Sequence, residues 1–207
     1  MCLHMICYII YDRPMIMHIL DQPHMKLGDG PIGLILAPTR ELAAQIHIEA
    51  KSFCKLYNIR VCPIFGGSGK WEMQQALQEA PEIVVATPGR LIELIRLKAT
   101  NLRRVTMLVL DEADRMFEMG FEYQMRSIVA NTRPDRQTLL FSATMKKKIE
   151  GFAREILNKP IRIVVGHFGQ SNPDIRQIVH VFQNENEKWF WLSKNTDDFI
   201  AEGKVLV

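Results

Sequence analysis

The stretch Leu108-Val109-Leu110-Asp111-Glu112-Ala113-Asp114 decides the fold of this chain. With Met107 in front of it, the stretch begins as a short apolar run and ends in three carboxylates within four residues. A short apolar run bounded by charge is typical of a buried parallel strand. Ligands of open α/β sheets bind beyond the carboxyl ends of such strands. We therefore expect Asp111 and Glu112 to emerge from a dry sheet at a ligand site.

Two interpretations of these carboxylates are open from the stretch alone. Many phosphoryl-transfer enzymes hold Mg²⁺ with an acidic residue at a strand tip, and a neighbouring carboxylate can orient the attacking water. Alternatively, the strand simply runs into a helix whose N-terminal dipole favours Asp and Glu. The rest of the chain has to decide between a magnesium site and a favourable helix start.

Size and composition indicate an ordinary globular protein. The chain has 207 residues, of which 47% are hydrophobic and 24% are charged, enough for one sizeable α/β domain. A net charge of +3 permits an anionic partner but is too small to predict one. The four cysteines include no Cys-x-x-Cys pair, which argues against a zinc site or a disulfide framework and favours reduced, intracellular thiols.

The apolar N-terminal segment does not predict a membrane anchor. Asp12-Arg13-Pro14 interrupts the first twenty residues, so no run approaches the ~20 residues that a membrane helix needs. No basic segment precedes the apolar residues, as it would in a secretory signal. We expect no membrane association and an intracellular location, in the nucleus or the cytoplasm.

Apolar runs and helical patterns alternate along the chain. Strands are expected at 32–36, 60–65, 83–86, 107–110, 138–141 and 161–165, and helices are expected at 15–20, 39–57, 71–79, from 88, from 111 to about 131, and from 146 to 157. Repeated strand–helix units predict an α/β fold with a parallel sheet covered by helices on both faces. The polar segments that follow the strands should then collect at one edge of the sheet.

The glycine-rich turn Gly66-Gly67-Ser68-Gly69-Lys70 invites comparison with a phosphate-binding P-loop. That pattern requires Gly, four residues, and then Gly-Lys followed by Ser or Thr. Here Ile64 stands where the first glycine belongs and Trp71 follows the lysine, so we reject a P-loop at this turn. Paired glycines still let backbone N–H groups approach a phosphodiester, although a plain strand-to-helix turn explains them equally.

A second candidate phosphate site is Thr87-Pro88-Gly89-Arg90. Thr87 can cap the following helix and Pro88 suits its first turn. A helix N-terminus with an arginine beside it is a natural phosphate site. The alternative is a well-capped helix with one exposed arginine.

Five segments at predicted strand-to-helix turns together resemble the motifs of DEAD-box RNA helicases. These segments are Pro38-Thr39-Arg40-Glu41-Leu42-Ala43, Gly66-Gly67, Thr87-Pro88-Gly89-Arg90, Asp111-Glu112-Ala113-Asp114 and Ser142-Ala143-Thr144. They occur in the order found in that family, and the resemblance extends from about residue 15 to residue 207. It implies an incomplete RecA-like P-loop NTPase fold and an ATP-dependent enzyme that unwinds or remodels RNA duplexes.

The resemblance also implies roles for individual residues. Asp111 would hold the Mg²⁺ of MgATP through water, and Glu112 would activate the attacking water. Asp114 would link to Ser142 and Thr144, coupling the nucleotide site to RNA. The residues expected to grip the RNA backbone are Thr39, Arg40, Gly67, Thr87, Gly89 and Arg90. Such backbone contacts carry no base specificity, and protein partners in RNA-processing complexes are a further expectation.

Two departures from the family pattern limit what we expect of these 207 residues. The family's adenine-reading glutamine segment and P-loop lie upstream of Pro38, yet no Gly-Lys-Thr or Gly-Lys-Ser occurs here, and the second domain is present only as its first part. We expect residues 1–13 to be an unassigned segment, 14–165 a partial RecA-like domain, 166–176 a linker, and 177–207 the start of a second RecA-like domain. Strands at 178–182 and 204–207 and a helix from about 187 are expected there.

Three functions remain open. The chain is a partial sequence of an ATP-dependent RNA helicase, a short non-catalytic product that binds RNA or protein partners, or an unrelated doubly wound enzyme that uses Asp111 for a metal. Without P-loop amides and lysine, the phosphates of ATP have no cradle, and the loss of one transition-state donor alone typically costs ~10²–10³ in rate. We therefore hypothesise that this chain alone neither hydrolyses ATP nor unwinds RNA.

Overall fold

The computed structural model describes residues 3–67, 69–165 and 178–203. The chain divides into two compact units, Met1–Pro160 and Ile161–Val207, and each is considered by itself. The expected linker at 166–176 and the expected strand at 204–207 lie outside the described residues.

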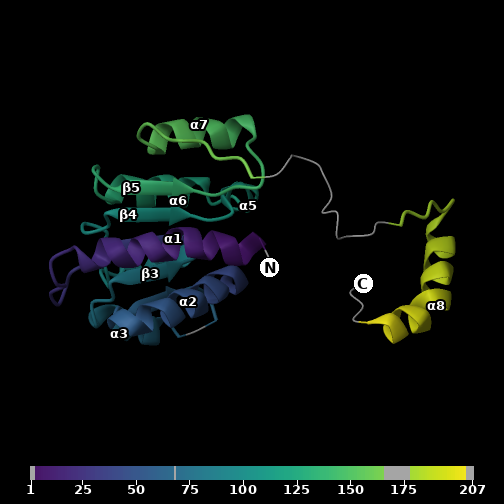
Figure 1. The fold of residues 1–207 in the computed structure, drawn as a ribbon, viewed down its shortest axis with the longest axis horizontal. Helices are drawn as coiled ribbons and strands as arrows, with labels where there is room; N and C mark the ends of the chain where they lie inside the picture. Colours follow the sequence, from purple (N-terminus) through teal and green to yellow (C-terminus); the bar gives the residue numbers. More distant parts are fainter. Residues whose placement is uncertain (1–2, 68, 166–177, 204–207) are drawn as a thin grey trace. The chain divides into compact units, whose positions relative to one another are not determined.

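The first unit is built on a five-stranded parallel sheet (Figure 1). Its strands lie in the order β2-β3-β1-β4-β5. Their bounds are β1 Gly33–Leu36, β2 Val61–Ile64, β3 Ile83–Ala86, β4 Met107–Leu110 and β5 Gln137–Leu140. Every residue of β1, β3 and β4 is buried, which explains why these strands are continuous apolar runs rather than alternating patterns.

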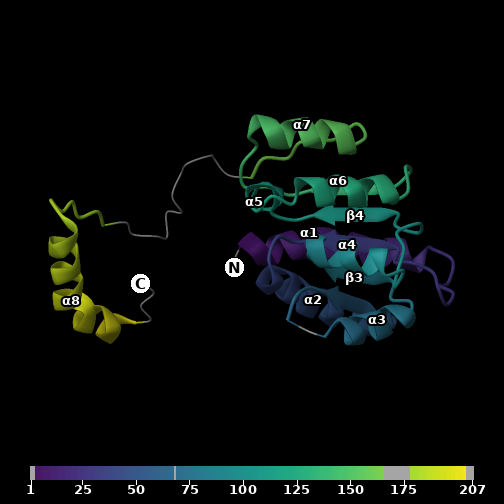
Figure 2. The same cartoon turned by 180° about the vertical axis from the view of Figure 1, so that it is seen from behind.

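Helices cover both faces of this sheet, as expected. Figure 1 looks onto the side that carries α1 (Leu3–Leu20) and α2 (Arg40–Cys54), whose last residues continue into the 3₁₀ helix η1 (Lys55–Tyr57). The opposite side, seen in Figure 2, carries the remaining helices of this unit. They are α3 Lys70–Gln78, α4 Pro88–Arg96, α5 Ala113–Glu118, α6 Glu122–Asn131 and α7 Lys147–Ile156.

Neighbouring residues of each central strand belong to different hydrophobic cores. Ile35 packs with Met15 of α1 and Ile46 of α2, whereas Leu34 and Leu36 pack with the helices of the other face. This division follows from the two-residue period of a strand, which turns successive side chains to opposite faces. The doubly covered sheet confirms the fold class that the strand–helix alternation predicts.

The helix α1 extends well before the residues for which a helix is expected. It runs from Leu3 through Pro14 to Leu20, although the sequence suggests helix only from Met15. Tyr11 and Met15 are fully buried in the core on this face. Gly33 of β1 leaves room for the contact, because a Cβ at that position would come within 2.5 Å of Met15 Sδ.

Three expected elements differ in the structure. The helix expected from Asp111 to about 131 is divided into α5 and α6, with Gly120 in the left-handed region at a φ of 78°. Glycine adopts that conformation without steric cost, so it ends α5 and lets α6 start in a new direction. The segments 161–165 and 178–182 are not strands, and their apolar side chains are exposed apart from that of Phe182.

The second unit contains the helix α8 (Glu185–Glu202), close to the helix expected from about residue 187. Asn184 caps it by accepting a hydrogen bond from the backbone N–H of Glu187 at 3.0 Å. Trp191 of this helix lies against His180 and Phe199, with ring centroids 4.5 and 5.7 Å away. Among the described residues of both units, no helix has the length and hydrophobicity required to cross a bilayer.

Candidate functional site

The strands of the sheet end in register at one edge, which we call the motif edge. Leu36 pairs with Ala86 on one side and with Leu110 on the other, and Ile64 and Leu140 continue the row outward. The ladder extends one residue further, since Asp111 N donates to Leu36 O at 2.9 Å and Thr87 N donates to Ile64 O at 3.0 Å. The five segments singled out in the sequence therefore leave the sheet side by side, as expected.

Asp111 is the first residue beyond β4 and is almost completely buried, at 5% exposure. Its Oδ1 accepts a hydrogen bond from the backbone N–H of Glu112 at 2.9 Å. Its Oδ2 accepts one from the hydroxyl of Tyr11 at 3.3 Å. Glu112 takes a left-handed backbone conformation, with a φ of 49° and a ψ of 53°. Residues other than glycine are strained in this conformation. Such strain is typical of functional sites, and it turns the chain abruptly from β4 into α5.

Asp114 joins the turn after β4 to the turn after β5. Its Oδ2 accepts hydrogen bonds from the backbone N–H and from the hydroxyl of Thr144, at 2.9 and 3.0 Å. Ser142 takes a different part in this link, because its hydroxyl donates to the carbonyl of Thr144 at 2.7 Å. The expected connection of Asp114 to both residues is thus direct for Thr144 and runs through Thr144 for Ser142.

A cavity of about 500 Å³ opens beside these carboxylates. Its lining includes Thr39 at the start of α2, and it includes Ala143. The charged side chains that line it are four carboxylates and one arginine: Glu41, Glu112, Asp114, Glu118 and Arg115. Carboxylate oxygens suit a hydrated divalent cation, whereas a triphosphate needs several cations or a row of N–H donors. The cavity therefore offers carboxylate oxygens on the Glu112 side of the turn, whereas Asp111 lies outside its lining, and its residues do not by themselves fit ATP.

Asp12 of α1 is a buried acidic residue that sequence reasoning missed. It is 1% exposed, and neither carboxylate oxygen has a hydrogen-bond partner within the described part of the chain. Burial, together with the nearby carboxylates of Glu49 and Asp111, raises the pKa of Asp12 to about 7. The sequence gives no signal for this residue, because it lies in a segment without a recognisable helical pattern.

The first expected RNA-binding segment lies over the glycine turn. Thr39 caps α2, and its hydroxyl accepts a hydrogen bond from the backbone N–H of Leu42 at 3.2 Å. Arg40 extends across the paired glycines, so that a Cβ on Gly66 would come within 3.1 Å of the arginine Cδ. Gly67 has a φ of 107°, and a Cβ there would lie 3.3 Å from Arg40 Nη1. The structure thus brings Arg40 and Gly67 together at the motif edge.

The second expected RNA-binding segment begins α4. Thr87 is largely buried at the N-cap, but its side chain makes no capping hydrogen bond in the described structure. A Cβ on Gly89 would meet only the ring of Phe121, at an ordinary 3.8 Å. Arg90 forms an ion pair with Glu93 at 2.6 Å and is 20% exposed, so it is not the isolated surface arginine of the alternative interpretation. Lys70 also pairs with Glu93 and, together with Arg90, lowers the pKa of that carboxyl.

Comparison with models of protein families shows which family has this arrangement of segments. The family model of the DEAD/DEAH box helicases matches residues 9–152. The chain belongs to this family. The matched region of this DEAD/DEAH box helicase chain contains all five motif segments and also reaches into α1, so that Tyr11 and Asp12 lie within it.

Individual relatives agree with the family model. The chain is 57% identical over 194 residues to the ATP-dependent RNA helicase DDX42 of Gallus gallus and 56% identical over 194 residues to that of Homo sapiens. These matches cover 94% of this DEAD/DEAH box helicase chain but only 21% of each relative. Among solved structures, the yeast DEAD-box splicing factor Prp28 aligns with a TM-score of 0.74 and 34% identity, over 92% of this chain and 46% of that one.

Proposed function

We propose that this chain supplies the carboxylate site and part of the RNA-binding surface of an ATP-dependent RNA helicase that unwinds or remodels RNA duplexes. The observation that carries the proposal is the link from Asp114 to Thr144, which ties the acidic turn after β4 to the turn after β5 beside a carboxylate-lined cavity. Because RNA duplexes are the proposed substrate, the proposed location is intracellular, in the nucleus or the cytoplasm. Protein partners in RNA-processing complexes are part of the same proposal.

The carboxylates divide the chemistry between them. Asp111 is the proposed holder of Mg²⁺ through water, and Glu112 is the proposed base that orients and deprotonates the attacking water. Bound Mg²⁺ would supply charge neutralisation for the phosphates of a nucleotide. The proposal is supported by the position of both residues at the tip of a fully buried strand, where ligands of open α/β sheets bind.

Phosphate contacts of the RNA are assigned to the two helix starts and the glycine turn. Arg40, with 57% of its side chain exposed, offers a cation beside the backbone of Gly67. Arg90 would exchange part of its ion pair with Glu93 for a phosphate, and Thr39, Thr87 and Gly89 let the chain approach the sugar–phosphate backbone at the helix N-termini. Such contacts provide affinity without reading base sequence.

These 207 residues are proposed to lack ATP turnover on their own. The cavity beside Glu112 is lined by four carboxylates and one arginine, and this excess of negative charge repels phosphates rather than cradling them. Tyr11 in addition engages the carboxylate of Asp111. Residues 14–165 are accordingly proposed as a partial RecA-like domain, and 177–207 as the start of a second one. The alternative, a non-catalytic chain that binds RNA or a protein partner, is favoured by the same Tyr11–Asp111 contact.

Binding of labelled single-stranded oligouridine, followed by fluorescence anisotropy, tests the RNA-binding part of the proposal. Affinity is expected to fall steeply between about 50 and 200 mM salt, because phosphate contacts release counterions. Arg40→Ala is expected to weaken binding and to reduce the salt dependence by about one counterion. Arg154→Ala on α7, an equal loss of charge at a 77% exposed side chain, serves as the control. Equal affinities for the two variants would contradict the proposed RNA-binding surface.

A further inference from the structure

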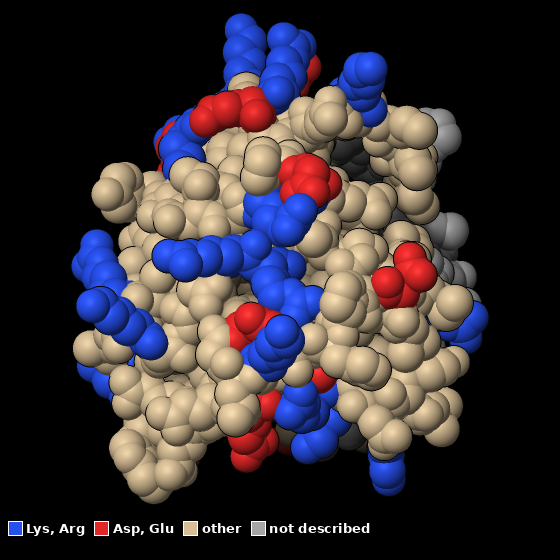
Figure 3. Space-filling model, turned by 90° about the vertical axis from the view of Figure 1, so that its left-hand side faces the viewer, with Lys and Arg blue, Asp and Glu red and all other residues tan. Residues whose placement is uncertain are grey.

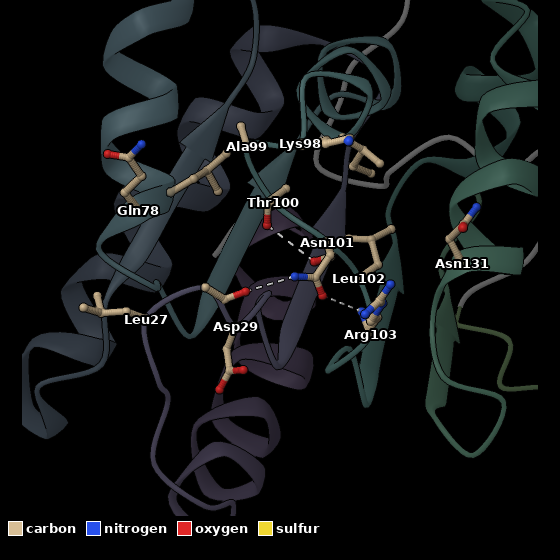
Figure 4. A pocket seen from close by; sticks show the side chains of 13 residues that line it. Leu27, Asp29, Gln78, Lys98, Ala99, Thr100, Asn101, Leu102, Arg103 and Asn131 are labelled. Carbon is tan, nitrogen blue, oxygen red and sulfur yellow. Dashed lines mark hydrogen bonds between the residues drawn. The ribbon is translucent and has the colours of Figure 1, made fainter.

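A hollow surface lies at the edge of the sheet opposite the motif edge, where the strands begin. It consists of a cavity of about 770 Å³ and a smaller one of about 260 Å³, which share Gln78, Lys98 and Ala99. We call the two together the α3–α4 groove, because α3 and the residues at and after the end of α4 form its walls. Figure 4 shows Lys98 to Arg103 running between Gln78 of α3 and Asn131 of α6, with Leu27 below. None of the five motif segments contributes to its lining.

The floor of the groove is held in place by contacts between two loops. Asn101 Nδ2 donates to the carbonyl of Gly28 at 3.1 Å, and Asn101 Oδ1 accepts from the backbone N–H of Arg103 at 3.1 Å (Figure 4). Gly30 packs so tightly that a Cβ on it would lie 1.9 Å from the carbonyl oxygen of Asn101. The groove is therefore formed before any ligand arrives, which lowers the entropic cost of binding.

The charge of the groove is positive. Lys98 and Arg103 line the larger cavity, and no salt bridge between described residues includes either of them. The one carboxylate in the lining, Asp29, is already neutralised by Arg104 at 2.8 Å. Figure 3 shows lysine and arginine side chains running across this face of the molecule. An incoming carboxylate would therefore meet two cations that have no competing ion-pair partner within the described part of the chain.

Large apolar side chains border the same groove without being covered. Leu27 is 87% exposed, Trp71 is 66% exposed and Leu97 is 53% exposed. Leu27 lines the larger cavity, and Trp71 and Leu97 line the smaller one. Exposed apolar residues grouped around a preformed hollow are typical of sites that bind another protein.

We propose that the α3–α4 groove binds an acidic amphipathic peptide segment of a partner protein. The apolar face of the segment would cover Leu27, Leu97 and Trp71, and its acidic residues would pair with Lys98 and Arg103. A peptide fits these observations better than RNA, because an apolar lining with only two unpaired cations offers little to a phosphate backbone. The site lies outside the motif edge, so it does not depend on the proposed RNA and ATP chemistry.

The test measures binding of a fluorescein-labelled helical peptide of about 16 residues, with leucine and phenylalanine at helical spacing and glutamate elsewhere. The whole 207-residue chain carries Lys98→Asn with Arg103→Glu; asparagine is chosen because residue 98 has a φ of 57°, which asparagine tolerates. Lys51→Glu with Lys55→Asn, at exposed positions of α2 and η1, makes the same change of charge elsewhere. Leu27→Ser tests the apolar contact separately.

The groove variant is expected to weaken peptide binding by about tenfold or more, while the α2 variant leaves it unchanged. Leu27→Ser is expected to weaken it as well. Absence of peptide binding to the unaltered chain would overturn the proposal. So would equal binding of a peptide with lysine in place of glutamate, or equal binding by the groove variant. Loss of oligouridine binding rather than peptide binding in the groove variant would assign the surface to RNA instead.

Discussion

Asp114 and Thr144 are joined through a single carboxylate oxygen of Asp114. This oxygen accepts hydrogen bonds from the backbone N–H and from the hydroxyl of Thr144, at 2.9 and 3.0 Å. The two residues lie 30 positions apart and follow neighbouring parallel strands. This link fixes the turn after β5 against the start of α5. A movement of either turn would therefore be transmitted to the other, as the proposed coupling between a nucleotide site and RNA requires.

Thr144→Val removes the hydroxyl donor but keeps the shape and the backbone bond. The free energy of unfolding is expected to fall by about 1–3 kcal/mol, because a partly buried carboxylate loses one of its donors. Urea denaturation measures the change, and Thr144→Ser, which retains the hydroxyl, is the matched control. Indistinguishable midpoints for the valine and serine variants would show that the Asp114–Thr144 hydroxyl bond carries no stability.

Tyr11→Phe removes the hydroxyl that donates to Asp111 while keeping the ring, which packs against Phe141 at a centroid distance of 5.5 Å. A hydrated cation at Asp111 would compete with that hydroxyl for the same oxygen. The variant is therefore expected to bind Mn²⁺, a probe for Mg²⁺, more tightly in paramagnetic relaxation titrations. Tyr123→Phe, at a 73% exposed tyrosine, is the control. Weaker or unchanged Mn²⁺ binding by Tyr11→Phe would contradict the competition.

Asp12 makes stability depend on pH. Its pKa is raised to about 7 in the folded chain by burial, with Glu49 and Asp111 adding to the effect, so the folded state holds a proton that the unfolded state releases near its ordinary value of 3.8. The contribution of protonated Asp12 to the free energy of unfolding is complete below pH 3.8. It is lost as pH rises through the folded-state pKa of about 7. Asp12→Asn is therefore expected to be more stable than the unaltered chain at neutral pH, by an amount on the order of a few kcal/mol.

Thermal melting at several pH values checks the Asp12 prediction. The difference between Asp12→Asn and the unaltered chain is expected to shrink as pH falls towards the ordinary carboxyl range. Asp21→Asn, at an exposed aspartate just after α1, controls for the loss of charge. A difference that stays constant with pH would mean that Asp12 does not take up a proton on folding.

Gly33→Ala tests the packing of α1 on the sheet. The added Cβ would lie 2.5 Å from Met15 Sδ, so either the methionine or the helix must shift, at an expected cost of about 1–3 kcal/mol. Gly151→Ala inside α7 is the matched control, because nothing lies within 4 Å of its added Cβ. That control is expected to stabilise the chain slightly, by about 0.5–1 kcal/mol. Equal stabilities for the two variants in urea would contradict a close contact of α1 with β1.

The sequence predicts the sheet and its edge well, because strong local signals act there. The run before Asp111 is apolar on every residue, as a strand buried on both faces must be, and parallel register then aligns all strand ends. The turn at Gly120 was missed because methionine and phenylalanine on both sides continue an apolar helical pattern. The segment 161–165 has strand composition, yet a strand also needs a neighbour for its hydrogen bonds, and composition cannot supply one.

The contacts of α1 with the site could not be predicted from the sequence, because they join distant parts of the chain. Tyr11 and Asp12 meet Asp111 across about a hundred residues, and the bond from Tyr11 to Asp111 spans 100 positions. No local pattern marks such a contact. Thr144 bonds to Asp114 directly, whereas Ser142 bonds to the carbonyl of Thr144. This difference depends on the geometry of the turn, which the motif alone does not specify.

These 207 residues are proposed to carry the carboxylates of a helicase ATP site without turning over ATP. The most direct measurement is ATP hydrolysis by the purified chain with and without oligouridine, beside Glu112→Gln. We expect no RNA-stimulated hydrolysis that distinguishes the two proteins. A rate stimulated by RNA and abolished by Glu112→Gln would contradict it, and would show that the chain assembles a complete ATP site.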